Sequence, residues 1–235
     1  MADKRAALDR DPDLSQTNAA LASMTALARV RWGFEVFGDG LAFTSSFGAM
    51  SAGLCHLVSV ARPGASVYFL ETGFHFPQTL AFRDALVSQL GLTLRVLTPA
   101  LEKSALQAEL GPEPYRANPE RCCEVNKVAP MRQLLQGVDA WISGVRAGQN
   151  AFRDGLAYIT RTQEGQYKLH PVLDWTSKDL YDYLQSNQLP THPLWEQGYT
   201  SIGCAPCTRA PLDAADERSG RWAGSDKTEC GLHYL

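Results

Sequence analysis

Short apolar segments alternate with longer helical patterns through most of this chain. Four segments have the length and apolar character of buried strands: residues 41–45, 67–70, 93–97 and 140–143. The helical patterns that follow or separate them are a stretch ending at Val60 and residues 77–90, 100–110 and 122–136. This alternation predicts an α/β fold with a mostly parallel sheet flanked by helices.

Two further patterns extend this domain. Residues 14–32 form an amphipathic helical pattern, for which Ser15 is the candidate N-cap. Residues 156–160 and 166–170, divided by Glu164-Gly165, predict an antiparallel hairpin at the edge of the sheet. The sheet is therefore expected to end in one antiparallel strand.

The C-terminal part of the chain differs in composition from the rest. Residues 176–185 predict a helix, with Thr176 as cap and Asp179 completing a capping box. Residues 208–235 are mainly polar and contain few apolar side chains, which predicts an extended, mobile tail. The expected organisation is one α/β domain over 1–207, with its N-terminal helix, and a flexible tail over 208–235.

Composition narrows the classes of function. The chain has 235 residues, 45% of them hydrophobic and 20% charged, and a net charge of −3. This balance gives no global basic field for nucleic acid or an anionic membrane, although a local basic site for a small anion remains open. No apolar run reaches about 20 residues, and residues 1–12 lack an apolar leader core. We expect a cytoplasmic protein.

Six cysteines are distributed unevenly: Cys55, Cys122, Cys123, Cys204, Cys207 and Cys230. In a reducing cytosol they are not expected to form structural disulfides. Their clustering indicates metal binding or redox chemistry. Cys55 lies in an apolar helical segment and is expected to be a core residue.

Four of these cysteines suggest one metal centre. Cys204 and Cys207 are separated by two residues, a common way to present two thiolates to a metal. Cys122 and Cys123 are adjacent, which suits a [4Fe–4S] cluster with separate iron corners better than a single zinc ion. A structural zinc site and a redox-active Cys204/Cys207 pair are the alternatives, although the second leaves Cys122 and Cys123 unexplained.

The serine loop, residues 45–51, joins the first expected strand to a helix. Its small residues allow backbone N–H groups to approach an anion, and a helix N-terminus adds partial positive charge. The hydroxyl groups of Ser45, Ser46 and Ser51 can donate hydrogen bonds. The loop lacks the Gly-Lys-Ser/Thr ending of a Walker A motif. An ordinary tight turn is the alternative interpretation.

Cys230 lies five residues from the end of the chain, followed closely by His233. A thiol on a flexible tail can enter a site, react, and then move out to meet a second protein. His233 or nearby arginines could hold the thiol as thiolate. The alternative is an exposed tail cysteine without a role.

Basic residues lie near these motifs. Lys127 follows Cys123 by one helical turn, so the two side chains should share a face. Arg146 follows an expected strand, and Arg218 and Arg221 lie in the tail. Arginines in such positions can clamp phosphate and sulfate oxygens, although scattered arginines are more often solvated. The remaining histidines that we considered are expected to be structural, surface or loop residues: His56, His75 and His192.

From about residue 40 to the C-terminus, these motifs together resemble the assimilatory sulfonucleotide reductases, in the branch that carries an iron–sulfur cluster and uses adenosine 5′-phosphosulfate. The segments that carry the resemblance are residues 45–49, 71–77, Cys122-Cys123 with Lys127, 141–146, 203–207, Arg218 with Arg221, and 229–233. Two positions depart from the usual pattern. Residue 147 is Ala and residue 126 is Asn, where the family often has basic residues.

The resemblance implies a fold, a cofactor and a set of site residues. The implied fold is the adenine-nucleotide α-hydrolase-like (PP-loop) fold. The implied cofactor is a [4Fe–4S] cluster, and its implied ligands are Cys122, Cys123, Cys204 and Cys207, with Lys127 between the cluster and the substrate. Cys230 is the implied nucleophile. The remaining implied contacts to substrate are Ser45, Ser46, Gly48, Ala49, Ser51, Arg146, Arg218, Arg221 and His233.

The implied reaction is reduction of adenosine 5′-phosphosulfate to sulfite and AMP through a Cys230 S-sulfonate, in sulfate assimilation and cysteine biosynthesis. Thioredoxin or glutaredoxin is the implied electron donor, and no nucleic-acid or membrane partner is expected; a homo-oligomer is compatible with the sequence. The alternatives are use of the 3′-phosphorylated nucleotide, alone or as well, an ATP-pyrophosphatase enzyme acting on tRNA, and a non-enzymatic zinc-ribbon module.

Overall fold

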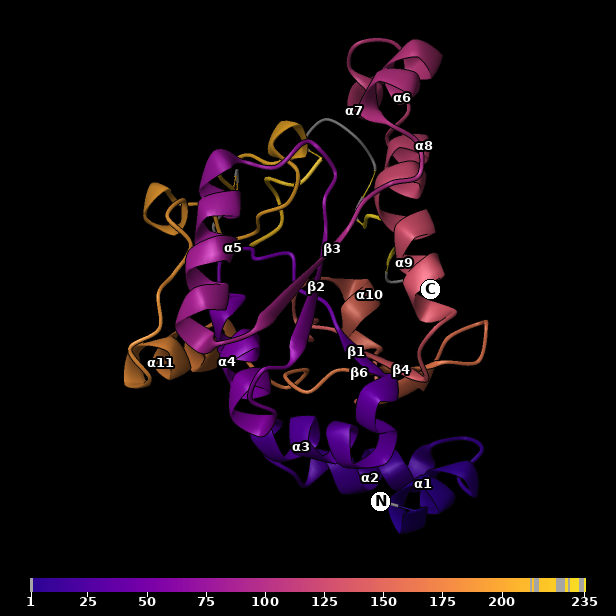
Figure 1. Ribbon diagram of the computed structural model, residues 1–235. Helices are drawn as coiled ribbons and strands as arrows, with labels where there is room; N and C mark the ends of the chain where they lie inside the picture. The colour runs from indigo at the N-terminus through magenta and orange to yellow at the C-terminus, as the bar shows by residue number, and fades with distance from the viewer. Residues whose placement is uncertain (1, 212, 214–215, 223–226, 228, 233–234) are drawn as a thin grey trace.

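The structure, a computed structural model, describes residues 2–211, 213, 216–222, 227, 229–232 and 235 (Figure 1). The helices are α1 (Ala2–Asp9), α2 (Ser15–Ala22), α3 (Ala26–Phe37), α4 (Ala52–Ala61), α5 (Pro77–Leu90), α6 (Lys103–Leu110), α7 (Pro114–Ala117), α8 (Pro119–Cys123), α9 (Ala129–Leu135), α10 (Ala151–Asp154) and α11 (Ser177–Ser186). The strands are β1 (Leu41–Phe43), β2 (Ser66–Leu70), β3 (Thr93–Leu97), β4 (Ala140–Ile142), β5 (Ile159–Arg161) and β6 (Tyr167–Leu169). A π-helical turn, Glu124–Val128, joins α8 to α9, and short 3₁₀ turns are Gly38–Gly40, Trp195–Gln197 and Ala205–Cys207.

The strands form the mostly parallel sheet that the sequence predicts. One group has the order β1-β4-β6-β5 and the other pairs β2 with β3. A parallel bridge between Thr44 and Tyr68 links β1 to β2, so the whole order is β3-β2-β1-β4-β6-β5. Strand β5 pairs antiparallel with β6 at the edge, and the other pairings are parallel. The predicted edge hairpin is confirmed.

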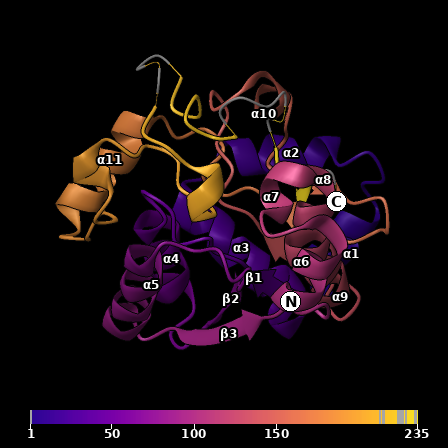
Figure 2. The same ribbon diagram turned by 90° about the horizontal axis from the view of Figure 1, so that it is seen from above.

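Helices cover both faces of this sheet. Figures 1 and 2 show α4 and α5 on one side and α9 on the other. The side chains of Phe43, Phe69, Ile142 and Leu169 are buried between these layers. No helix among the described residues combines the length and the apolar character that crossing a membrane requires.

The N-terminal helical pattern is divided into two helices, which corrects the single helix expected over 14–32. Helix α2 ends at Ala22, and Thr25 starts α3 by accepting a hydrogen bond from the Ala28 backbone at 3.3 Å. Ser15 is the first residue of α2 and not its cap; the cap position is Leu14, which contributes no side-chain hydrogen bond. A Thr followed by helix-forming residues was the local signal for this second start.

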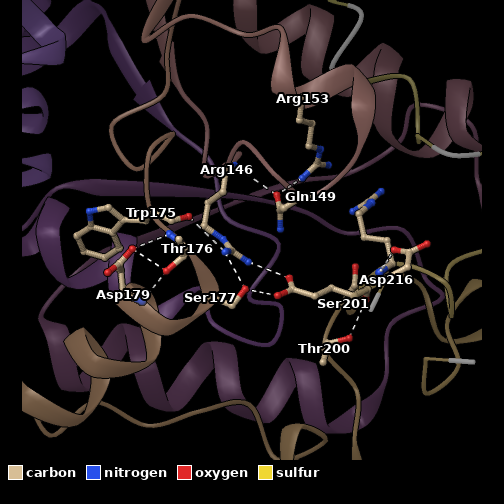
Figure 3. Close-up of polar contacts among 12 residues, drawn as sticks. Arg146, Gln149, Arg153, Trp175, Thr176, Ser177, Asp179, Thr200, Ser201 and Asp216 are labelled. Atoms are coloured by element: carbon tan, nitrogen blue, oxygen red, sulfur yellow. Dashed lines mark hydrogen bonds and ion pairs between the residues drawn. The ribbon is translucent and has the colours of Figure 1, made fainter. Parts of the chain in front are cut away.

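The capping box of α11 is confirmed. The Thr176 hydroxyl oxygen accepts from the Asp179 backbone at 3.1 Å, and the Asp179 carboxylate accepts from the Thr176 backbone at 2.9 Å (Figure 3). This cap fixes where α11 begins, and therefore where Ser177 lies.

Several described residues of the C-terminal segment, residues 208–235, are buried. Thr208 and Arg221 form an antiparallel bridge, and the Trp222 side chain is buried. The bridge needs a glycine at 220, because a Cβ there would lie 2.9 Å from the carbonyl carbon of Arg209. The end of the chain packs beside α9 (Figure 1). The tail mobility predicted from composition stays a prediction.

Candidate active site

The main cavity, of about 280 Å³, opens where the parallel strands end. Its lining includes residues within three positions of the ends of β1, β2, β4 and β6, and ligands of open α/β sheets commonly bind at this edge. It brings together ten residues that the sequence singled out: Ser45, Ser46, Gly48, Ala49, Ser51, Lys127, Arg146, Arg218, Arg221 and Cys230. The predicted contact from His233 lies outside the described residues.

The serine loop forms one wall of the main cavity. The Ser45 backbone N–H donates to the Tyr68 carbonyl at 3.1 Å, which ties the loop to β2. Phe47 has a φ of 47°, a strained conformation for a bulky residue, and its ring is fully buried against Phe69. Burial of this ring offsets the strain and turns the following residues toward the cavity. The loop then leads into the N-terminus of α4, which favours an anion.

Arg146 projects from the loop after β4 with only 8% of its side chain exposed. Its guanidinium donates to the Ser177 hydroxyl at 3.0 Å and to the Trp175 carbonyl at 3.4 Å (Figure 3). It also forms an ion pair with Glu217 of the C-terminal segment at 3.0 Å. Arg146 is thus held in a fixed position in the main cavity, where its fork of donors can bind an oxyanion.

Arg218 and Arg221 reach the main cavity from the C-terminal segment. Burial, aided by the positive charge of Arg153, lowers the pKa of Arg218 to about 10. The Arg221 guanidinium stacks over the Trp222 ring, 4.4 Å from its centroid. Arg221 also fits closely over Gly203, where a Cβ would lie 2.7 Å from the guanidinium carbon. The glycine before the Cys204 pair therefore allows this arginine to reach its place.

The thiol cavity, a second and narrower pocket, lies beside the first. Its lining includes all four cysteines of the predicted metal centre: Cys122, Cys123, Cys204 and Cys207. Cys122 and Cys123 end α8, Cys204 precedes the 3₁₀ turn at 205–207 and Cys207 ends it, and none of the four forms a disulfide. Burial, together with neighbouring sulfurs, raises the pKa of Cys122 and Cys123 to about 11. A positive charge beside these thiols favours their thiolate form, and Lys127 acts on both in this direction.

The candidate metal ligands that line the thiol cavity are all cysteine sulfurs. Among the described residues, no three His, Cys, Asp or Glu side chains converge closely enough to hold a single metal ion. A structural zinc ion needs four donors at about 2.0–2.3 Å from one point. An iron–sulfur cube instead binds each cysteine at a separate iron corner, and its ligands are thiolates alone. The all-sulfur donor set around one cavity therefore fits a [4Fe–4S] cluster.

Lys127 and Cys204 line both cavities. Lys127 lies in the π-helical turn, and like Cys123 it faces the thiol cavity, as the sequence spacing suggested. Burial lowers its pKa, but the charges of nearby sulfurs, Cys204 first, outweigh burial and raise the pKa above the usual lysine value. The neighbouring Asn126 donates its side-chain amide to the Cys122 carbonyl at 2.9 Å and contacts the Cys122 sulfur at 3.6 Å.

Cys230 lies between two openings. It lines the main cavity on one side and a surface groove with Glu120, Glu124, Arg132 and Glu164 on the other. The thiol can therefore face a small molecule inside the protein or a second molecule outside it without leaving this part of the fold.

Comparison with known proteins identifies the family. Residues 40–210 match the family model described as the phosphoadenosine phosphosulfate reductase domain. The chain belongs to this reductase family.

Relatives of this reductase match it almost end to end. It is 40% identical over 214 residues to the adenosine 5′-phosphosulfate reductase of Streptomyces coelicolor, covering 91% of this chain and 90% of the relative. It is also 40% identical over 225 residues to the Geobacillus kaustophilus enzyme of the same name, covering 94% of each. The Rhodococcus erythropolis enzyme of that name is 35% identical over 97% of each chain.

Solved structures show the fold of the reductase. The crystal structure of phosphoadenylyl-sulfate reductase from Candida auris, a phosphate complex, matches with a TM-score of 0.72 and 23% identity, over 83% of this chain and 96% of that one. Yeast FAD synthetase matches with a TM-score of 0.56 and 16% identity, over 80% and 66%. The adenine-nucleotide α-hydrolase-like fold predicted from the sequence is confirmed.

Several cavity residues of the reductase carried no sequence signal that marked them. Glu217, Gln149 and Arg153 line the main cavity, yet no motif spacing points to them. Glu229 lay within a noted segment but had no predicted role. Lys168, from the middle of β6, lies near this region with its ammonium 4.3 Å from the Trp141 ring centroid. Glu217, Glu229 and Lys168 were missed because their partners are remote in sequence, whereas Gln149 contacts Arg146 and Arg153 nearby but belongs to no recognised motif.

The other singled-out residues have structural contacts. Cys55 is fully buried, as expected for a core residue. His56 hydrogen-bonds the Tyr183 hydroxyl at 2.8 Å. The His192 ring is buried and lies 2.9 Å from the Thr79 hydroxyl, and burial lowers its pKa to about 4. His75 lines the main cavity, but its ring nitrogen lies 2.9 Å from the Leu70 carbonyl.

Proposed function

We propose that this oxidoreductase reduces adenosine 5′-phosphosulfate to sulfite and AMP, with Cys230 as its nucleophile. One observation carries the proposal most directly: Cys230, Lys127 and four arginines line the same cavity. The names of full-length relatives at 35–40% identity support the choice of nucleotide. The same relatives argue against a tRNA-modifying enzyme and a zinc-ribbon module.

The first step is nucleophilic attack on the sulfur of the phosphosulfate. The Cys230 thiolate forms a bond to that sulfur, and the bond from sulfur to the bridging oxygen breaks, so that AMP leaves with the electron pair. Negative oxygens shield the sulfur, so positive groups must neutralise them for a thiolate to approach. Lys127, Arg146 and Arg221 supply such charge in a partly desolvated cavity, where it acts most strongly.

Arg146 must exchange partners for this step. Its guanidinium is paired with the Glu217 carboxylate, and an incoming sulfate or phosphate group would replace that carboxylate. The hydroxyl of Ser177 binds both side chains, so it would stay beside Arg146 during the exchange. Substrate binding is therefore expected to move the Glu217 side chain.

The second step regenerates the thiol. A dithiol protein such as thioredoxin or glutaredoxin attacks the Cys230 sulfur, and sulfite leaves. The second thiol of the donor then resolves the mixed disulfide, so that the donor ends oxidised and Cys230 ends reduced. The surface groove beside Cys230 supports such an approach from outside. Sulfite made in this way would enter cysteine biosynthesis in the cytoplasm.

We assign the four thiol-cavity cysteines as ligands of a [4Fe–4S] cluster. When bound there, the cluster would supply a charged centre next to Lys127, which lines both cavities. The Asn126 amide would donate to the ligand sulfur of Cys122. The roles of the chain's own residues in the two steps do not require the cluster to change oxidation state.

A second candidate substrate is 3′-phosphoadenosine 5′-phosphosulfate. The family description and the Candida auris structure both name a reductase of the phosphorylated nucleotide. Sulfite release measured with each nucleotide at equal concentration separates the candidates. We expect the non-phosphorylated nucleotide to give the larger kcat/KM.

The mechanism is tested by omitting the electron donor. Given adenosine 5′-phosphosulfate without a dithiol, the cluster-loaded enzyme should release one AMP per chain and stop. Mass spectrometry should then find a sulfonate on the peptide that contains Cys230, and thioredoxin should remove it.

Two variants complete the test. Cys230→Ser should keep the cluster absorbance and release no sulfite. Cys55→Ala is the matched control, because Cys55 lies in the core outside both cavities, and it should form the sulfonate normally. Sulfite release by the serine variant would contradict the nucleophile, and a sulfonate on Cys204 or Cys207 would contradict the cluster assignment.

A further inference from the structure

The carboxylate of Glu229, the residue before Cys230, is almost completely buried, with 1% of its side chain exposed. Arg153 binds both of its oxygens, through Nε at 2.7 Å and Nη2 at 3.1 Å. The Asn150 side-chain amide donates to it at 2.9 Å, and Arg218 donates at 3.3 Å. Four donors thus hold one carboxylate directly beside the proposed nucleophile.

The groups that hold Glu229 are themselves fixed. Asn150 caps α10 by accepting from the Arg153 backbone at 3.0 Å, so one residue both starts this short helix and binds the carboxylate. The Gln149 side-chain oxygen accepts from the Arg153 guanidinium and from the Arg146 backbone (Figure 3). The Glu229 site is therefore connected to the loop that carries Arg146 in the main cavity.

A weaker contact holds the chain beyond Cys230. The Lys168 ammonium lies 3.4 Å from the Leu232 carbonyl and above the ring of Trp141. The Leu232 side chain packs with Met131 and Trp141. The chain is therefore fixed one residue before and two residues after Cys230.

We propose that Arg153 and Asn150 are positioning residues of the reaction: they hold the Glu229 carboxylate and thereby keep the Cys230 sulfur in the main cavity for attack. Adjacent Cα atoms are separated by about 3.8 Å, so an immobilised Glu229 leaves the Cys230 backbone little freedom. Displacement of a reacting group by about 1 Å can cost on the order of 100-fold in rate. The proposal rests on the proposed function, because it assumes that Cys230 is the nucleophile.

The two half-reactions place different demands on how Cys230 is held. Attack on the nucleotide needs the sulfur inside the main cavity, whereas reduction of the S-sulfonate needs a protein dithiol to reach the same sulfur. An anchor that holds the segment in place therefore speeds the first half-reaction and does not help the second. A contact that only stabilised the fold would affect both half-reactions together.

The test compares the two half-reactions in Arg153→Gln and Glu229→Gln. The first rate is AMP release in a single turnover without dithiol. The second is sulfite release by excess thioredoxin from enzyme already converted to the S-sulfonate. We expect the first rate to fall on the order of 10- to 100-fold, and the second to stay the same or rise.

Arg29→Gln is the matched control. Arg29 is also a buried arginine paired with a carboxylate, Asp174, and neither of the two residues lines the main cavity. Its loss should lower the unfolding midpoint without changing the ratio of the two rates. Parallel loss of both rates in folded Arg153→Gln, or an unchanged first rate, would overturn the proposal. Failure of the native enzyme to form any S-sulfonate would instead overturn the proposed function.

Discussion

Two regions enclose the main cavity, and they are stabilised by different forces. The sheet side, formed by β1, the serine loop and β4, is held by apolar burial; every residue of β1 and β4 is buried. The C-terminal segment contributes Glu217, Arg218 and Glu229, and buried ion pairs of Glu217 with Arg146 and of Glu229 with Arg153 join it to the domain. The sheet side therefore resembles a protein core in its apolar packing. The C-terminal segment resembles a protein–protein interface in its ion pairs.

This difference suits the two tasks of the site. Apolar packing fixes the nucleotide-facing wall, because any displacement would expose core side chains to water. Buried ion pairs give more orientation than net stability, since removing charges from water offsets much of their attraction. A segment held in this way can be placed accurately and still be released at moderate cost.

The largest expected effect compares truncations of one aliphatic side chain in each region. Ile142 in β4 is fully buried, so Ile142→Ala should lower the free energy of unfolding by about 2–5 kcal/mol. Leu232 is only partly buried, so Leu232→Ala should cost about 1 kcal/mol or less. Urea unfolding followed by circular dichroism measures both. Equal losses would show that the C-terminal segment belongs to the core.

Next in size is the effect of the lysine between the two cavities. Lys127→Ala should lower the rate of sulfite release about 100- to 1000-fold, as expected for loss of an oxyanion-stabilising charge. The visible absorbance of the cluster should be retained. Lys178→Ala, at an exposed lysine of α11, is the control and should leave the rate unchanged. An unchanged rate of sulfite release in Lys127→Ala would show that Lys127 has a structural role only.

Acid should weaken the sheet side through His170, which follows β6. Burial, with help from the charges of Lys168 and Arg153, lowers the pKa of His170 to about 3. Between pH 6.5 and about 3, the unfolded chain binds a proton that the folded chain does not. Folding stability should therefore fall by about 1.4 kcal/mol per pH unit in that window from this group.

The native chain is compared with the variant His170→Gln, which lacks the titrating ring. Its free energy of unfolding should depend less steeply on pH than that of the native chain when both are unfolded in urea at pH 6.5, 5.5 and 4.5. If the free energy of unfolding depended equally on pH in both proteins, acid would destabilise the fold through a group other than His170.

The smallest expected effect concerns the cap of α11. Thr176→Ala removes both hydrogen bonds of the Thr176 hydroxyl with Asp179 and should cost about 1 kcal/mol of stability. Sulfite release should change little, because the Ser177 contact to Arg146 belongs to the next residue. If Thr176→Ala instead lost much of its sulfite release and kept its stability, the cap would be needed to position Arg146.

Local sequence signals predicted the scaffold well. Helix α5 and strand β3 have the bounds expected from the sequence, since Pro77 starts the helix and Gly91 ends it with a φ of 61°. The serine loop and Arg146 meet around one cavity, because they follow β1 and β4, which end at the same edge of the sheet. Arg218 and Arg221 reach the same cavity from the C-terminal segment. Their individual roles stay predictions.

The partners of charged residues could not be predicted. Arg153 and Glu229 are 76 residues apart and Arg146 and Glu217 are 71 apart, so no local pattern links them. A polar composition predicted a mobile tail over 208–235, yet in the described part of that segment two of the charged side chains, Arg218 and Glu229, are largely buried in ion pairs. Composition counts charges but does not reveal which of them meet an opposite charge in the fold.

The π-helical turn between α8 and α9 makes the length of this stretch as important as its chemistry. Such a turn contains one residue more than a regular helix would use. Deleting one residue within Glu124–Val128 would restore a regular helix and leave α9 close to its present orientation, because the extra residue is what widens the turn. Met131 and Leu135 would then keep their packing against Trp141, whereas side chains inside the turn would shift around the helix axis by about 100°. A deletion of one residue here should therefore leave the fold intact and still displace Lys127 from its place between the two cavities.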